Sequence, residues 1–376
     1  MPESLLSKAR ICHLEDLLFF EGGEGALRAL KLLIQIALGD ADTLSMKVDG
    51  SPALYIGRND NGEFVCTDKS GFYAKTYNGR FTSVDQFISR KMSRATTDEK
   101  MEKLRPYLRE INQSWSLLES IVPENFRGYV KGDVMWFPNK YKINGNYILF
   151  KPNTVLYKVD SRSVLGQEIL KSKMGFAVHT FYDLKTKTEN PVFDNAGLLD
   201  NTNVCLLTQK KIKKQNGRLN VNINKIKRIR EKVKTNKKNI DLFFNKETLQ
   251  SSGLEKLPLV FYGYINFLTK TMDYSNLESR FIQWMYQNAG ITNKLKVKYN
   301  DYITDNKRIV DIIFDLFIDI QQLKNEIIDL LDNKDESDLS AYVDNRKGGE
   351  GYVVTDENGP VKLVNRYSFS ATNFNK

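Results

Sequence analysis

The sequence predicts an α+β protein, because two different hydrophobic patterns occupy different stretches of the chain. Apolar residues recur at helical spacing in residues 1–40, 83–121 and 308–331. Short apolar or alternating runs, typical of strands, occupy residues 44–67 and 126–160 and return after 350. With 376 residues, 41% of them hydrophobic and 27% charged, the chain is long enough to bury a core without disulfides.

The first predicted helix lies in residues 1–40 and presents one apolar stripe. The stripe consists of Ala26, Ala29, Leu30, Leu33, Ile34 and Ala37. This spacing places all six on one side of a helix, and Gly39 suits the position just after its end.

Strands are expected next, at residues 44–48, 53–56 and 63–67, with a hairpin turn at Asp60-Asn61-Gly62 between the last two. Residues 83–121 are expected to be helical. Residues 126–160 then return to strands, with Val130, Val134 and Trp136 near one face of the sheet.

The middle of the chain, residues 161–345, is rich in Lys and Asn and reads as mainly helical. It includes a long, mostly packed helix at 308–331. The last thirty residues predict a hairpin of residues 351–354 and 361–364. We therefore expect one domain from residues 1–160 and 346–376, and a helix-rich basic domain from residues 161–345 inserted into it.

Positive charge is concentrated in one stretch of that insert. The chain carries 56 Lys and Arg against 46 Asp and Glu, a formal charge of +10. Thirteen of the basic residues and one acid lie between Lys210 and Lys238, so the rest of the chain is slightly acidic. Ile223, Ile226, Ile229 and Val233 give this run helical spacing. A solvated helix face is the simpler interpretation of such a run, but the extreme bias in sign favours contact with a phosphate backbone. The residues expected to bind nucleic acid are Lys210, Lys211, Lys213, Lys214, Lys225, Lys227, Arg228 and Arg230.

The composition also excludes several kinds of site. Three scattered cysteines and two histidines argue against a disulfide framework, a cysteine zinc site and a multi-histidine centre. The first sixteen residues lack the apolar segment of a signal peptide. We expect a monomer without a membrane partner, located in the cytoplasm, or in the host cytoplasm if a phage encodes it.

The peptide Lys47-Val48-Asp49-Gly50-Ser51 carries the chemistry that the sequence suggests. A lysine that leaves a strand into a glycine turn can stand at the mouth of a pocket and act as a nucleophile. Further peptides follow in order: Thr67-Asp68-Lys69-Ser70, a strand containing Asp133, a strand containing Tyr157, Glu350-Gly351 before a strand, and Lys362 in the next strand. Each alone reads as a turn, a core aromatic or a surface charge, but the ordered series is far more specific.

This series resembles the covalent nucleotidyltransferase superfamily, which includes ATP-dependent DNA and RNA ligases, and ligase-like proteins of tailed phages. The resemblance covers residues 45–160 and 346–370. It implies a nucleotidyltransferase domain of antiparallel sheets with helices, and an ATP-dependent polynucleotide ligase that joins 5′-phosphate and 3′-hydroxyl ends.

The resemblance also implies roles for individual residues. Lys47 would form a lysyl-AMP adduct, and Lys362 would neutralise the α-phosphate. Glu350 and Asp133 would hold Mg²⁺. Asp49, Gly50 and Lys69 would contact the nucleotide, and Tyr157 would stack on adenine.

Some positions depart from the family pattern. Ser45 and Pro52 stand where DNA ligases have an acid and an arginine, and Val364 replaces the second lysine of the last motif. The sequence ends fourteen residues after Lys362, so we expect no C-terminal OB-fold. Sealing of nicked DNA is slightly favoured. An RNA ligase of the same superfamily, and a non-catalytic phage protein that binds nucleic acid, are the alternatives.

Overall fold

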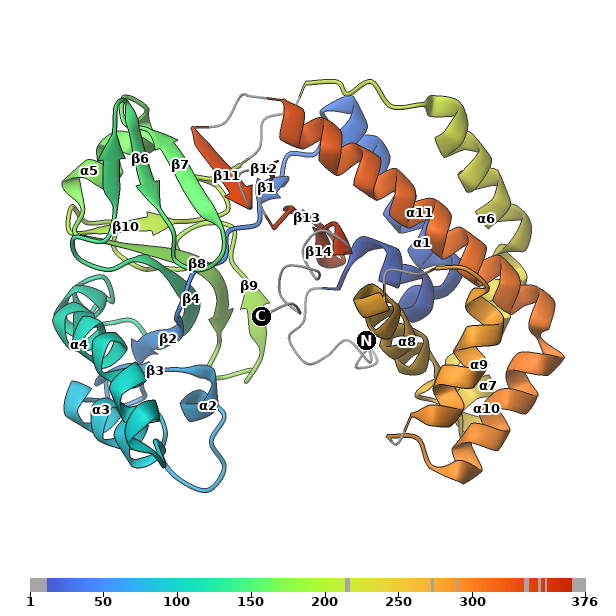
Figure 1. The fold of residues 1–376 in the computed structure, drawn as a ribbon, viewed down its shortest axis with the longest axis horizontal. Coiled ribbons are helices and arrows are strands. Elements are labelled where there is room, and N and C mark those ends of the chain that lie inside the picture. The colour runs from blue at the N-terminus through green and yellow to red at the C-terminus, as the bar shows by residue number, and fades with distance from the viewer. Residues whose placement is uncertain are drawn as a thin grey trace. The chain divides into compact units, whose positions relative to one another are not determined.

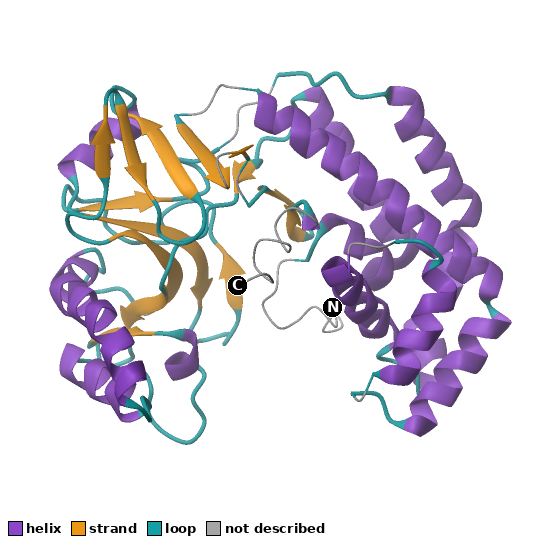
Figure 2. Ribbon diagram, viewed as in Figure 1, coloured by secondary structure: helices purple, strands orange, loops and turns teal. Residues whose placement is uncertain are grey.

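The structure is a computed structural model that describes residues 12–213, 217–271, 274–288, 290–334, 338–343, 346–348 and 350–366. Its contacts divide the chain into two compact units. The first, here the helical unit, comprises Met1–Leu44, Asn216–Lys334 and Gly351–Lys376. The second, here the sheet unit, comprises Ser45–Gln215 and Asp335–Glu350. Helices dominate one unit and strands the other, so the expected α+β class is confirmed (Figures 1 and 2).

The helical unit is built around α1 and α11, which pack against α6. In α1 the predicted stripe is buried through Ala26, Ala29, Leu30 and Leu33, and Gly39 ends the helix at φ 86°, as expected. None of the described helices is long and apolar enough to cross a bilayer. The elements of this unit are η1 (Leu14–Asp16), α1 (Leu17–Leu38), α6 (Ile223–Phe243), α7 (Lys246–Ser251), α8 (Leu257–Thr271), α9 (Leu277–Gln287), α10 (Asn293–Asp305), α11 (Lys307–Asn333), β13 (Tyr352–Asp356) and β14 (Gly359–Leu363).

The predicted C-terminal hairpin is confirmed as β13 and β14. The two strands are antiparallel, with Tyr352 opposite Leu363 and Asp356 opposite Gly359. Two contacts tie the hairpin to the N-terminal part of the unit. Arg28 of α1 donates to Asp356 over 2.8 Å, and the Lys362 N–H donates to the Cys12 carbonyl over 3.0 Å.

A charged cluster lies in the interior of the helical unit. Lys324 of α11 is fully buried, and its Nζ donates to Glu15 Oε1 and Oε2 over 2.8 and 2.9 Å and to the Val364 carbonyl over 2.7 Å. Arg366 donates to the same Glu15 carboxylate over 2.9 Å and contacts Asp16. Burial raises the pKa of Asp16 to about 6. The cluster joins η1, α11 and the end of the hairpin.

The sheet unit contains two sheets. One has the strand order β10-β8-β4-β2-β3, with β9 added on β8, and the other has the order β12-β11-β7-β6-β5. Pairing is antiparallel except between β8 and β10. The strands are β1 (Ser45–Met46), β2 (Ala53–Arg58), β3 (Phe64–Thr67), β4 (Gly128–Trp136), β5 (Lys142–Asn144), β6 (Tyr147–Phe150), β7 (Leu156–Asp160), β8 (Met174–Tyr182), β9 (Glu189–Pro191), β10 (Val204–Leu207), β11 (Leu339–Val343) and β12 (Arg346–Lys347).

Helices cover the first of these sheets, as the pattern at residues 83–121 suggests. α3 (Val84–Ser93) and α4 (Asp98–Ser120) bury Phe87, Ile111 and Leu118 against Ile56 of β2 and Val130 of β4. The unit also contains α2 (Lys69–Phe72) and α5 (Val164–Lys171).

The observed division of the chain differs from the expected one. The described residues 161–213 do not join a helical insert, because β8 pairs with β4 and β10 with β8, which extends the first sheet. The described residues 12–44 belong to the helical unit rather than to the two sheets of the sheet unit, because α1 packs against α6 and α11. The helical unit is therefore assembled from three separate stretches of chain.

We expect Lys324→Met to lower the free energy of unfolding of the helical unit by about 3 kcal/mol, since removing one partner leaves a buried charge without full compensation. Urea unfolding followed by helical circular dichroism measures the effect. Lys31→Met, which removes a pair whose side chains are 58% and 69% exposed, serves as the control and should cost less than about 1 kcal/mol. Equal effects of the two substitutions would contradict the prediction.

Candidate active site

Lys47 lies directly after β1 and is held between two carboxyl groups of the sheet unit. Its Nζ lies 2.7 Å from Asp49 Oδ1 and also contacts Glu350 Oε2. The Lys47 side chain is 22% exposed and that of Glu350 only 2%. The pair is therefore largely removed from water, which strengthens the attraction between its charges.

The backbone of Asp49 is fixed by two side chains from the neighbouring sheet. The Tyr157 hydroxyl accepts a hydrogen bond from the Asp49 N–H over 3.0 Å and donates to the Asp49 carbonyl over 3.2 Å. Asn153 Nδ2 donates to the same carbonyl over 3.1 Å. These bonds hold the turn that carries Lys47 and Asp49.

Gly50 and Asp133 form the next contact of the site. The Gly50 N–H donates to Asp133 Oδ2 over 3.0 Å, and His179 Nε2 lies 3.1 Å from the same oxygen. A Cβ at Gly50 would stand 2.3 Å from the Val134 carbonyl oxygen, so only glycine permits this approach of the turn to β4. The structure thus brings together Lys47, Asp49, Gly50, Asp133, Tyr157 and Glu350 from distant parts of the sequence.

The ionisation of the two carboxyl groups differs. Burial, together with the hydrogen bond to Asp49, raises the pKa of Glu350 to about 8. Burial opposes ionisation of Asp49 as well, but the hydrogen bond from Glu350 and the Lys47 charge hold the pKa of Asp49 well below its usual value. Asp49 and Glu350 together raise the pKa of Lys47 against the effect of burial. The site therefore sets the Lys47 ammonium between Asp49, which ionises readily, and Glu350, whose ionisation burial opposes.

Tyr157 is a structural part of the site in this conformation. Its side chain is fully buried, and its ring stacks on Phe150 with centroids 5.4 Å apart. Burial raises the pKa of its hydroxyl well above the usual value. The ring is therefore not exposed to a base here, in contrast to the expected stacking on adenine, and its hydroxyl positions Asp49 instead.

Lys69 and Lys362, the other two predicted site residues, stand on separate elements. Lys69 is exposed at the first residue of α2. Lys362 lies on β14 and belongs to the helical unit.

Sequence reasoning missed two residues of the site, Asn153 and His179. Asn153 also accepts from the Val155 N–H over 2.8 Å, which is the local turn bond typical of asparagine before a strand. His179 stands on β8, and only the pairing of β8 with β4 places it beside Asp133. The turn chemistry of Asn153 is readable from sequence, whereas the position of His179 depends on the topology of the sheet.

The basic residues expected to bind nucleic acid differ in their partners, and several of them are paired with carboxylates. Lys210 pairs with Asp194, Lys211 with Glu168, and Lys225 with Glu326, at 3.1, 3.1 and 2.8 Å. Lys213 forms a backbone bridge with Ser45. Lys214 lies outside the described residues.

On α6, Ile226, Ile229 and Val233 are buried, which confirms the predicted amphipathic helix. Its exposed residues include Lys227, Arg228 and Arg230. Among the described members of the predicted set, these three are exposed and form no ion pair with a carboxylate.

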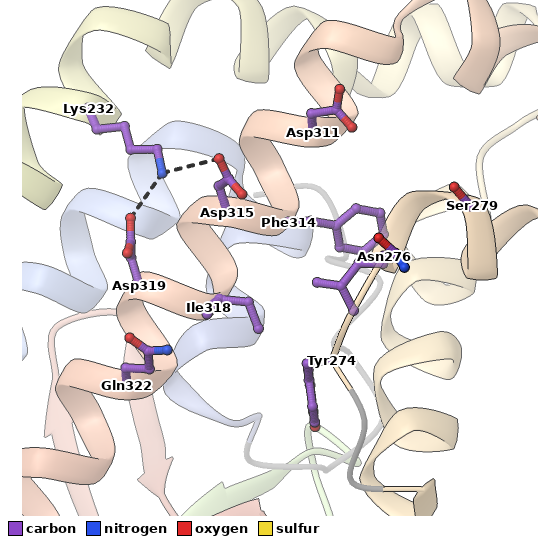
Figure 3. A pocket seen from close by; sticks show the side chains of 11 residues that line it. Lys232, Tyr274, Asn276, Ser279, Asp311, Phe314, Asp315, Ile318, Asp319 and Gln322 are labelled. Carbon is purple, nitrogen blue, oxygen red and sulfur yellow. Dashed lines mark hydrogen bonds and ion pairs between the residues drawn. The ribbon is translucent and has the colours of Figure 1, made fainter.

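A pocket of about 670 Å³ lies in the helical unit between α6, α9 and α11 (Figure 3). Lys232 of the basic run points into it and pairs with Asp319 at 3.0 Å and with Asp315 at 3.6 Å. The residues of the Lys47 site do not line this pocket. Lys232 is therefore a half-buried lysine whose charge is paired with carboxylates of α11.

Because the folded protein favours protonated Glu350, wild-type stability should fall relative to Glu350→Gln as pH rises. The stability that proton binding at Glu350 adds to the fold is fully present below pH 4.5, the pKa of this group in the unfolded chain. It is lost as the pH rises through about 8, the pKa of Glu350 in the folded protein. The difference in melting temperature between Glu350→Gln and wild type should therefore grow in favour of the variant between about pH 5 and about pH 9. Glu63→Gln, at an exposed acid of the same unit, is the control, and a difference that stays constant with pH would contradict the expectation.

Comparisons with known proteins identify a family. A search among curated proteins finds no match to the chain, and neither does a search among solved structures. The family described as "Family of unknown function (DUF6267)" matches residues 9–376. Because this match covers nearly the whole sequence, the chain is a member of the DUF6267 family.

Proposed function

We propose that the protein is an ATP-dependent polynucleotide ligase that works through an adenylated Lys47. The observation that carries the proposal is the convergence of the Lys47-to-Gly50 turn with Asp133, Tyr157 and Glu350 in one partly buried site. These residues stand at the positions through which the sequence resembles the covalent nucleotidyltransferases.

In the first step, the Lys47 amine attacks the α-phosphorus of ATP. A nitrogen–phosphorus bond forms, the bond to the bridging oxygen breaks, and pyrophosphate leaves. The proton lost by Nζ passes to a neighbouring carboxylate, for which Asp49 and Glu350 are in contact. The AMP then passes to a 5′-phosphate, and a 3′-hydroxyl displaces it. Lys362 would stabilise the negative charge that develops on the phosphates.

Two acidic residues are available for the Mg²⁺ that accompanies ATP. Among the residues that the structure describes, no three His, Cys, Asp or Glu side chains form a ready metal site. Mg²⁺ bound with a nucleotide takes phosphate oxygens and waters as most of its ligands, so one or two carboxylates suffice. Glu350 and Asp133 supply that number, and the ion would orient the leaving pyrophosphate.

Nicked duplex DNA is the substrate we favour slightly over RNA. The exposed Lys227, Arg228 and Arg230 of α6 suit a phosphate backbone and carry no information on base sequence. A second candidate is a protein that binds nucleic acid without catalysis. It is favoured by the ion pairs that keep Lys47 in its ammonium form.

Incubation of the full chain with α-labelled ATP and Mg²⁺ should give a covalent protein adduct that is lost on treatment with acid. Lys47→Arg should show no adduct, because its guanidinium stays protonated and is not nucleophilic. Glu350→Gln should form the adduct about 10²-fold more slowly. The matched control is Lys140→Gln, at a lysine of the same unit that pairs with Glu110, and it should react like wild type.

Formation of the adduct by Lys47→Arg, or no adduct on the wild-type protein, would overturn the ligase proposal. The absence of an adduct on wild type would favour the second candidate, a protein that binds nucleic acid without catalysis. If wild type is labelled, nicked DNA, nicked RNA and single-stranded RNA offered in parallel identify the substrate by the joined product.

A further inference from the structure

The five-stranded sheet of the sheet unit has one apolar face and one face that remains partly open. Ile148, Phe150, Tyr157, Val159 and Ala341 point into the core, where Leu165 and Ile169 of α5 also pack. Side chains alternate along a strand, so their neighbours point the other way. Those neighbours form what we call the outer face. Lys142, Tyr147 and Lys347 are exposed there, and Leu149, Leu156, Lys158, Ser340 and Tyr342 are half-buried.

The strand register places lysines at regular intervals across this face. Lys142 of β5 is opposite Leu149 of β6, which is opposite Lys158 of β7. On the other side of β7, Leu156 is opposite Tyr342 of β11, which is opposite Lys347 of β12. Lys142 and Lys158 are thus two strands apart in one row, or about 10 Å at the usual strand spacing. Lys347 lies two strands beyond β7, in the row of Leu156, and Ser340 is opposite Lys158 on β11. The other intervening positions are apolar or aromatic.

Tyr147 adds an exposed ring beside this row. The side chain is 39% exposed, and the Lys158 Nζ lies 3.7 Å from the centre of its ring. This cation–π contact keeps the Lys158 ammonium over the sheet. Of the acids on this side of the sheet, Asp160 is paired with Arg162 at 2.6 Å, and the exposed Asp338 directly precedes β11. The face is therefore positively charged and carries aromatic rings between the charges.

We propose that this face binds single-stranded nucleic acid. Lysines at regular spacing would contact phosphates, while Tyr147 and Tyr342 would stack with bases, a combination that binds single strands with little sequence preference. A duplex hides its bases, so it would lose the stacking contribution. The proposal does not depend on ligase activity, and the face is distinct from both α6 and the Lys47 site.

Anisotropy titration of labelled oligo(dT) and oligo(rU), each of about 20 nucleotides, with the full chain tests the proposal. Changing Lys142, Lys158 and Lys347 together to Gln should weaken the affinity for whichever of the two oligonucleotides the wild type binds by at least tenfold. It should also reduce the slope of log affinity against log salt by about 2, as expected for three lost phosphate contacts. Tyr147→Leu should weaken binding about five- to hundredfold without changing that slope.

The matched control changes Lys100, Lys103 and Arg109 of α4 to Gln, which removes the same charge from exposed positions elsewhere on the sheet unit. Circular dichroism and thermal melting establish that each variant is folded. Wild-type affinity and salt slope in the Lys142, Lys158 and Lys347 variant would overturn the proposal, as would equal competition by blunt duplex DNA. The variant with Lys142, Lys158 and Lys347 changed to Gln should still form the adduct with α-labelled ATP as wild type does. The adduct assay therefore tests the ligase proposal independently of the oligonucleotide binding.

Discussion

The ion pair between Lys47 and Glu350 is the constraint on which the architecture of the sheet unit depends. The two residues are 303 positions apart in the sequence, and the Glu350 side chain is almost completely buried. Removing one partner of a buried pair costs about 3–5 kcal/mol, so the chain must return to this unit after leaving it for the helices. The pairing of β11 with β7 makes this return, because it sets Ala341 opposite Tyr157. Tyr157 in turn holds the backbone of Asp49.

The same contacts set a condition on the proposed chemistry. An amine must lose its proton before it can attack phosphorus, yet both carboxyl groups stabilise Lys47 as the ammonium. Mg²⁺ that approaches the site would compete with Lys47 for these carboxylates and weaken that stabilisation. The resting site would therefore protect the lysine until substrate arrives.

Local features of the fold were predictable from sequence, and long-range ones were not. The stripe at Ala26 to Ala37, the long helix that became Lys307–Asn333 and the hairpin ending near Leu363 depend on neighbouring residues, and each was found. The domain boundaries depend on which distant segments pair. No sequence pattern in residues 174–207 indicates that these strands extend the sheet of β4, so the prediction assigned them to a helical insert.

The site shows the same limit. That Lys47 and Glu350 belong to one site was predicted from the order of the motifs along the chain, because no local pattern links the two residues. Tyr157 was identified as part of the site, but burial of its ring against Phe150 decides what it does, and burial is a property of the fold. His179 escaped notice because a lone histidine in a strand has no distinguishing pattern, and only sheet pairing sets it 3.1 Å from Asp133.

The charge of +10 also has a different meaning in the folded chain. A count along the sequence assigns the excess to one basic run, but Lys210, Lys211, Lys225 and Lys232 are paired with carboxylates. Such pairs weaken the positive field that a phosphate backbone would meet. The number of basic residues in the run therefore exceeds the charge that it could offer to nucleic acid. Lysines that are unremarkable in sequence, such as Lys142 and Lys158, gain importance because the register of β5, β6 and β7 aligns them on one face. The proposed binding of nucleic acid would therefore depend on which cations the fold leaves accessible rather than on where the sequence concentrates them.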